Sequence, residues 1–122
     1  MAADDRLRPL RWVGSARSDL KSFPSPVRWE IGQALYAAQN GDMDPAAKPM
    51  KGFAGGSVLE IAAPFDGDTW RAVYTVRFRD AVYVLHAFQK KSKQGIATPK
   101  KDLDLIKKRL RDAELDNKRR QN

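Results

Sequence analysis

TWRAVYTVRFRDAVYVLHAF, residues 69–88, decides the fold because it contains the two strongest strand signals of the chain. β-branched and aromatic residues fill both halves, and the link Arg79-Asp80 between them is short, so we predict an antiparallel hairpin. Alternation along the first half divides its side chains between two faces. The predicted core face holds Trp70, Ala72, Tyr74, Val76 and Phe78, and the other face holds Arg71, Val73, Thr75 and Arg77.

Weaker signals precede the hairpin. RPLRWV, at 8–13, predicts a strand, and the following SARSDLKSF predicts a helical turn that Pro24 ends. A clear amphipathic helix comes next, with Ser25 as its cap and Pro26 at its first position, and it stops at Asn40-Gly41. The residues at helical spacing, which we expect to be buried, are Val27, Ile31, Ala34, Leu35 and Ala38.

The segment at 41–56 is rich in glycine and proline and predicts a long loop, which leads into a strand, VLEIAA, at 58–63. A last helix is expected after the cap Thr98 and Pro99, with apolar residues Leu103, Ile106, Leu110 and Ala113. The predicted fold class is α+β: a small domain with an antiparallel sheet, N-terminal helices on one face and a C-terminal helix. We expect all the helices to cover the same side.

Length and composition describe one soluble domain, residues 1–122, with 1–6 and 116–122 expected to be flexible. The chain has no cysteine and one histidine, which excludes thiolate and histidine-rich metal clusters, so we expect neither a metal nor another cofactor. It contains no signal-peptide core and no apolar run of membrane-spanning length. A cytoplasmic protein without membrane contact is therefore expected.

Positive charge is in excess. The formal net charge is +8 and the pI is near 10.0, which favours polyanionic partners, although many small basic proteins use such charge only for solubility. The stretch HAFQKKSKQGIATPK, residues 86–100, places Lys90, Lys91 and Lys93 within four residues of one another. Like charges this close repel one another, so an anionic ligand is expected there.

Three segments resemble the RelE/ParE superfamily of toxins from bacterial toxin–antitoxin pairs, in its phage-derived, HigB-like branch. They are DLKSFPSPVRWEIGQAL, KPMKGFAGGSVLEI and WRAVYTVRFRDAVYVLHAFQKKSKQGIATPKKDLDLIKKRL, and together they cover most of the chain from Asp19 to Leu110. The run FQKKS followed by TP is the most specific of these matches.

The resemblance implies a RelE-like fold and a toxin that cuts mRNA on the ribosome without a metal and is silenced by a helix-turn-helix antitoxin. Two alternatives remain open. Relatives of the ParE kind inhibit DNA gyrase and are not nucleases, and a basic phage protein can bind nucleic acid without catalysis.

The resemblance also suggests catalytic residues. Arg71 matches an arginine that binds the scissile phosphate, a role that suits a planar guanidinium. Lys90, Lys91 and Lys93 lie where the family has another cation. We expect Lys90 and Lys91 to be catalytic and Lys93 to bind RNA, and the alternative is a solvated charge run.

Further candidates are less specific. His86, the only imidazole, suits acid–base catalysis but lies inside an apolar strand, where packing is the competing interpretation. Glu60 can orient Arg71 or accept a proton, in place of the basic residue of many relatives. The expected RNA-binding residues are Lys51, Lys93, Arg77 and Phe88, with Lys48 a weaker candidate.

Overall fold

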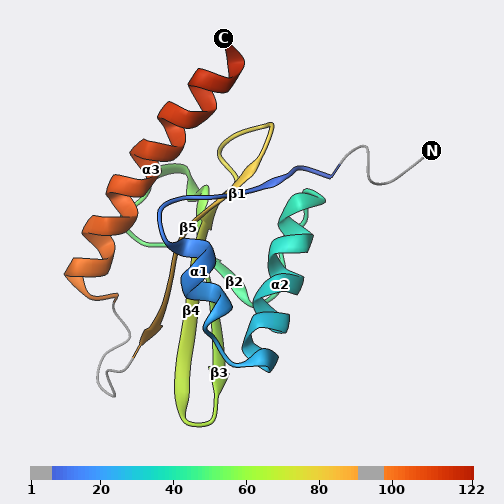
Figure 1. Cartoon of the computed structure of the whole chain (residues 1–122), viewed down its shortest axis with the longest axis vertical. Coiled ribbons are helices and arrows are strands. Elements are labelled where there is room, and N and C mark those ends of the chain that lie inside the picture. The colour runs from blue at the N-terminus through green and yellow to red at the C-terminus, as the bar shows by residue number, and fades with distance from the viewer. Residues whose placement is uncertain (1–6, 91–97) are drawn as a thin grey trace.

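The computed structural model describes residues 7–90 and 98–122 and shows helices on both sides of a central sheet (Figure 1). The elements in chain order are β1 (Leu10–Trp12), α1 (Ala16–Lys21), α2 (Ser25–Gln39), β2 (Ala47–Pro49), a 3₁₀ turn (Ala54–Gly56), β3 (Val58–Phe65), β4 (Asp68–Thr75), β5 (Val82–Lys90) and α3 (Lys100–Gln121). The predicted α+β class is confirmed. β2 and the 3₁₀ turn are additions, because they lie in a segment that we expected to be loop.

The sheet has five strands in the order β1-β5-β4-β3-β2. β2, β3, β4 and β5 pair antiparallel, and β1 pairs parallel with β5 at the edge, so the sheet is mixed. β3 and β4 are joined by a two-residue turn, Asp66-Gly67, in which both residues have positive φ, 52° and 84°. Asp-Gly is a favoured sequence for such a turn because its twist matches that of the flanking strands.

The predicted hairpin of β4 and β5 is confirmed, but its predicted two-residue link is wrong. β4 ends at Thr75, whose hydroxyl donates to the carbonyl oxygen of Ser57 at 2.9 Å and accepts the backbone N–H of Arg77 at 3.1 Å. These bonds turn the chain out of the ladder, so residues 76–81 form a longer connection. Phe78 therefore leaves the face predicted for it.

β5 carries a bulge. Val73 pairs with His86 and Tyr74 pairs with Val84, which leaves Leu85 without a partner on β4. Because a bulge inserts one residue into one strand only, the side chains on either side of it can point the same way. Leu85 and His86 both lie on the side of the sheet that α3 covers.

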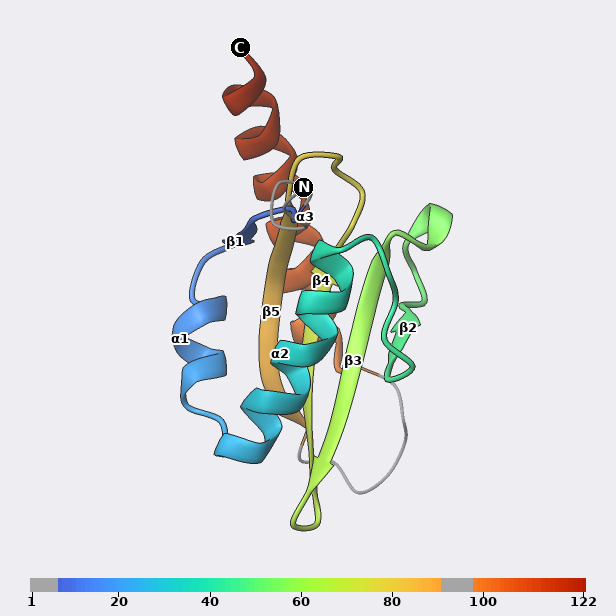
Figure 2. The ribbon, with the colours of Figure 1, turned by 90° about the vertical axis from the view of Figure 1, so that its right-hand side faces the viewer.

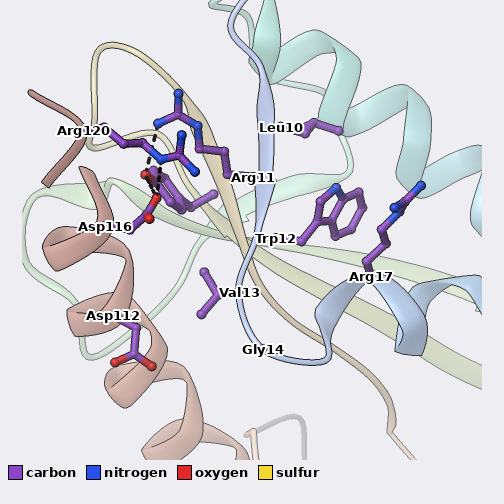
Figure 3. Close-up of a pocket in the computed structure, with 10 residues that line it drawn as sticks. Leu10, Arg11, Trp12, Val13, Gly14, Arg17, Asp112, Asp116 and Arg120 are labelled. Carbon is purple, nitrogen blue, oxygen red and sulfur yellow. Dashed lines mark hydrogen bonds and ion pairs between the residues drawn. The ribbon is translucent and has the colours of Figure 1, made fainter. Parts of the chain in front are cut away.

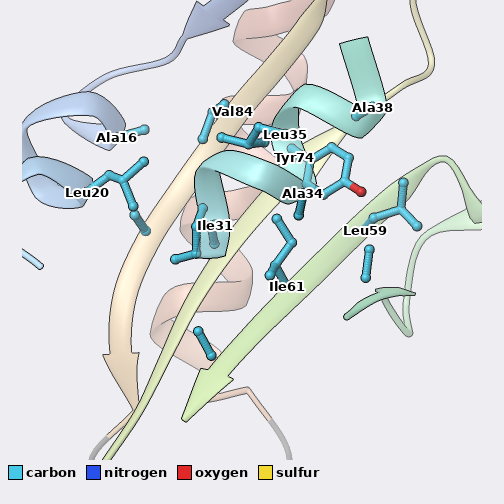
Figure 4. Packing of buried hydrophobic residues seen from close by; sticks show 14 of the residues in the cluster. Ala16, Leu20, Ile31, Ala34, Leu35, Ala38, Leu59, Ile61, Tyr74 and Val84 are labelled. Carbon is cyan, nitrogen blue, oxygen red and sulfur yellow. The ribbon is translucent and has the colours of Figure 1, made fainter. Parts of the chain in front are cut away.

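Two apolar cores lie on the two sides of the sheet. Figure 2 shows the helices on its two sides, and Figure 4 shows side chains of the first core. α1 and α2 form the first core with inward side chains of the sheet, which include Leu59, Ile61, Ala72, Tyr74 and Val84. α3 forms the second core with the opposite side, which includes Val58, Val73, Tyr83 and Leu85. The expectation that all helices cover one side is therefore wrong. The face of β4 that carries Arg71 also carries apolar residues, and α3 buries them.

Arg109 fixes α3 to its neighbours although it is buried in the second core. Its Nη1 donates to the carbonyl oxygen of Leu85 at 3.0 Å, and its Nη2 donates to Oγ of Ser15 at 3.1 Å. Gly14 has a φ of +55°, and a Cβ atom at this position would lie 2.9 Å from the guanidinium. Glycine is therefore required where the turn between β1 and α1 passes this arginine.

The end of α3 extends past the sheet (Figure 1). Residues 116–121, which we expected to be flexible, continue the helix. Asp116 anchors this part by accepting the hydroxyl of Tyr83 at 2.6 Å. Within the described ranges, no helix has both the length and the apolar character that a membrane crossing requires.

Two leucines of equal size test how much the first core stabilises the fold. Leu35 on α2 is 2% exposed, whereas Leu115 on α3 is 65% exposed. Leu35→Ala is expected to lower the free energy of unfolding by about 2–5 kcal/mol, because it leaves a cavity in the core. Leu115→Ala is expected to change it by less than about 0.5 kcal/mol. Urea unfolding followed by circular dichroism measures both, and equal effects would contradict the assignment of α2 to the core.

Candidate functional site

A cavity of about 570 Å³ lies on the α3 side of the sheet, between the β2–β3 edge and the start of α3. Its walls combine apolar and charged groups from segments far apart in the sequence. They are Ala46, Lys48, Pro49, Met50, Lys51, Glu60, Ala62, Arg71, Thr98 and Leu103. An apolar pocket with a few converging polar groups is the usual form of a binding site.

Glu60 and Arg71 form an ion pair in this cavity. They lie diagonally across the β3–β4 ladder, where Ala62 pairs with Arg71 and Glu60 with Val73. Nη1 of Arg71 donates to Oε1 of Glu60 at 2.7 Å, and both side chains are mostly buried. Nε of Arg71 is buried and has no hydrogen-bond partner among the described residues. The guanidinium therefore keeps an unused donor, which is shielded from solvent in the described structure.

The other oxygen of Glu60 accepts a long hydrogen bond, 3.4 Å, from the hydroxyl of Thr98. Thr98 was predicted only as a helix cap, but Pro99 takes the cap position and Thr98 faces the site instead. No sequence signal beyond its position before the proline identified it. The carboxylate is thus held by Arg71 from β4 and by the segment that leads into α3.

Lys90 lies on the same side of the sheet as Arg71. Arg71 pairs with Phe88 on β5, and Lys90 follows two residues later. The side chain of Lys90 is only 8% exposed, and its Nζ has no hydrogen-bond partner in the part of the chain that the structure describes. Burial lowers the pKa of Lys90, and the positive charge of Arg71 lowers it further, whereas Glu60 opposes the shift. This ammonium therefore releases its proton more readily than an exposed lysine.

The remaining lysine candidates divide into two groups. Lys51 and the weaker candidate Lys48 both line the cavity, with exposed side chains at its rim. Lys91 and Lys93 lie outside the described residues. The cationic groups brought together by the structure are therefore Arg71, Lys90 and the two rim lysines.

Arg77 lies apart from this cavity. It follows the end of β4, and its Nη1 donates to Oε2 of Glu114 on α3 at 2.8 Å. Its Nε contacts Oγ of Ser57 at 3.4 Å. Among the described contacts of this side chain none involves the cavity, so the structure does not join Arg77 to Arg71 as the shared strand face had indicated.

His86 lies beneath α3 and outside the cavity lining. Its Nε2 lies 2.8 Å from Oδ1 of Asp102, and its Nδ1 lies 3.4 Å from Nη1 of Arg109. Arginine has only donors, so Nδ1 is the acceptor and Nε2 carries the proton that Asp102 accepts. The ring also stacks on Phe88, with centroids 4.8 Å apart and planes at 16°. This arrangement holds α3 on the sheet and favours the packing interpretation of His86.

Phe88 has a half-buried side chain that packs against the second core. One of its ring faces is covered by His86. It is the cross-strand neighbour of Arg71, so it lies beside the site without being part of the cavity lining. Stacking of a nucleobase on Phe88 remains a prediction.

A second cavity, of about 690 Å³, follows β1 between α1 and the last turns of α3 (Figure 3). Asp116 is its most strongly perturbed group. The hydrogen bond from Tyr83 lowers the pKa of this carboxyl, and the bond from Arg120 lowers it further. Burial raises the pKa of the Tyr83 hydroxyl, and its bond to Asp116 adds to the shift. The hydrogen bond between Tyr83 and Asp116 joins β5 to α3, whereas Arg120 contacts Asp116 within α3.

In residues 7–90 and 98–122 there is no group of three or more carboxylate or imidazole side chains with the geometry to hold a metal ion.

His86→Ala distinguishes a structural role of this residue from a catalytic one. It leaves polar groups of Asp102 and Arg109 without their partner, so we expect a loss of about 1–3 kcal/mol in the free energy of unfolding. Any RNA cleavage per folded molecule should persist, because the cavity residues are unchanged. Denaturant titration and transcript cleavage give the two readouts. Unchanged stability of His86→Ala combined with loss of cleavage would instead support a catalytic role of His86.

Asp116→Asn tests the anchor of α3. The pKa of Asp116 is lower in the folded state than its usual 3.8, so its stabilising effect is present above pH 3.8 and is lost as the pH falls below it. The variant should therefore be less stable than the parent chain at neutral pH, and the difference should shrink towards about pH 2.5. Urea unfolding at both pH values measures this. Asp112→Asn, which removes a half-exposed carboxylate that pairs with Lys108 within α3, is the control, and an equal effect of the two variants would refute the anchor.

Comparison with known proteins identifies a family for the chain. No curated protein and no solved structure matches the chain. A family model described as "Phage derived protein Gp49-like (DUF891)" matches residues 18–111. This range contains Glu60, Arg71, Lys90 and α3 as far as Arg111. Because the match covers most of its length, the chain belongs to the phage-derived Gp49-like family.

Proposed function

We propose that this chain is the toxin of a two-gene toxin–antitoxin module and that it cleaves mRNA on the ribosome. The observation that carries the proposal is the gathering of Arg71, Glu60 and Lys90 on one side of the sheet, beside a cavity with a lysine rim. The net charge of +8 supports a polyanionic substrate. The RelE-like and HigB-like assignment remains a prediction within the phage-derived family.

The three side chains match the requirements of RNA cleavage through the ribose 2′-hydroxyl. The 2′-oxygen attacks phosphorus, a 2′,3′-cyclic phosphate forms, and the bond from phosphorus to the 5′-oxygen breaks. The reaction needs an acceptor for the 2′ proton, a donor to the leaving oxygen, and cations for the charge that develops on the phosphate. Glu60 is suited to the first role, Lys90 to the second and Arg71 to the third.

Arg71 can bind a phosphate without first losing Glu60. Its Nη1 is held by the carboxylate, whereas its buried Nε has no partner among the described residues. A phosphate oxygen that accepts from Nε would lie close to Glu60, which positions the proton acceptor near the reacting group.

Lys90 has the properties expected of a proton donor. An ammonium with an ordinary pKa holds its proton too strongly for efficient transfer near neutral pH. Burial and the charge of Arg71 lower the pKa of Lys90, which makes the transfer easier. Its Nζ has no hydrogen-bond partner among the described residues, so it can donate to a substrate oxygen that reaches this buried atom.

The partners follow from the same function. A helix-turn-helix antitoxin, encoded beside this gene, would silence the toxin by covering the cationic cavity or by moving α3 away from the sheet. The substrate of the toxin would be mRNA bound to the ribosome, so the toxin would act in the cytoplasm.

Two arginines provide a matched test. Arg71→Ala removes the proposed phosphate contact and should lower transcript cleavage about 10²–10³-fold, with loss of growth arrest. Arg77→Ala removes an arginine that pairs with Glu114 away from the cavity, so cleavage should change little. Mapping of transcript ends after a short induction measures both variants. Equal cleavage by the parent chain and Arg71→Ala would refute the assignment.

The same induction separates the alternatives. Double-strand DNA breaks and an SOS response, with transcripts intact, would indicate a gyrase inhibitor. Salt-sensitive nucleic-acid binding without cleavage or growth arrest would indicate a non-catalytic binding protein.

A further inference from the structure

The outer face of α2 differs from an ordinary solvated helix surface. Trp29 and Tyr36, two turns apart on this helix, are 69% and 53% exposed. Gly32 and Gln33 lie between them on the same face, because residues three, four and seven apart are neighbours on a helix. We call these four residues the α2 stripe, and none of them is charged. In α3, by contrast, most residues are charged.

The composition of the α2 stripe is that of a protein interface. Tryptophan and tyrosine are enriched where proteins bind one another, whereas charged side chains are depleted from the centre of such contacts. Two large exposed aromatic side chains on one helix also increase the tendency to aggregate, unless a partner covers them.

Gly32 supplies a second observation. Glycine is among the least favourable residues in the interior of a helix. A Cβ atom at Gly32 would meet nothing within 4 Å, so packing within this chain does not require the glycine. A missing side chain between two exposed aromatic residues allows the backbone of another helix to approach closely.

The face is distinct from the cationic cavity. α2 packs on the first core through Ile31 and Leu35, and the cavity lies on the side of the sheet that α3 covers. Figure 2 shows α2 and α3 on opposite sides of the sheet. The stripe carries no positive charge, so RNA is a poor ligand for it and a protein is the better one.

The charge of the chain selects the kind of partner. Two copies with a net charge of +8 would repel each other. Lys21 and Arg28 are exposed near the start of α2 and form no ion pair with any described residue, whereas Glu30 is the only acidic residue of the helix. These charges favour a partner with carboxylates around an apolar ridge.

We propose that the α2 stripe docks an amphipathic helix of an acidic partner protein, whose apolar ridge packs between Trp29 and Tyr36 over Gly32. The partner then binds on the opposite side of the sheet from Arg71. Binding and RNA cleavage are consequently separable by substitution.

The test rests on the proposed function only in its choice of probe, the protein encoded by the reading frame beside this gene. The probe is purified and titrated against the full chain by calorimetry. The double variant Trp29→Ala, Tyr36→Ala should weaken binding about 100-fold or more. Leu115→Ala removes an exposed apolar side chain elsewhere and should leave binding unchanged.

Two further variants make the outcome decisive. Gly32→Ala should weaken binding while the unfolding temperature stays equal or rises, which separates docking from folding. In an Arg71→Ala background, which should lose transcript cleavage, the double variant should weaken binding by the same factor as in the parent chain, so failure of the nuclease proposal and failure of the docking proposal give different results. No complex with the parent chain, unchanged binding by the double variant, or self-association of the chain through this face would overturn the proposal.

Discussion

The burial of β5 on both faces is the constraint on which the rest of the structure depends. Side chains from Val82 to Ala87 are all buried, because α1 packs on one side of this strand and α3 on the other. A strand covered in this way has no room for a ligand along most of its length. The candidate site therefore lies at the end of the sheet where α3 begins, on the side where Arg71 and Lys90 both lie.

Most of the fold could be predicted from local pattern. The spacing of Val27, Ile31 and Leu35 indicated α2, and alternation in β4 indicated its two faces. β2 could not be predicted, because three residues that include Pro49 show no periodicity. The position of α3 is a long-range property, and neither the apolar stripe of this helix nor the sequence of β4 shows on which side of the sheet it packs.

The candidate site likewise combines features that the sequence predicts with features that depend on contacts between distant segments. The alternation of β4 already separated Arg71 from the first core, and the strand end placed Lys90 near Arg71. The ion pair of Arg71 with Glu60 depends on the register of β3 against β4, which the residues of either strand alone do not reveal. The role of Thr98 depends on how the chain enters α3. Arg77 shares the strand pattern of Arg71 but follows the end of β4 and turns to Glu114.

The unpaired Leu85 determines which face of the sheet each later residue of β5 occupies. If β5 ran in regular register, every side chain after Leu85 would exchange faces. Lys90 would then enter the layer of α1 and α2, and its ammonium would be separated from Arg71 by the whole sheet. One additional residue in a strand thus keeps Leu85 in the second core and Lys90 on the side of the sheet that carries Arg71. A homologue that loses this irregularity would preserve the architecture while it separates the two cations.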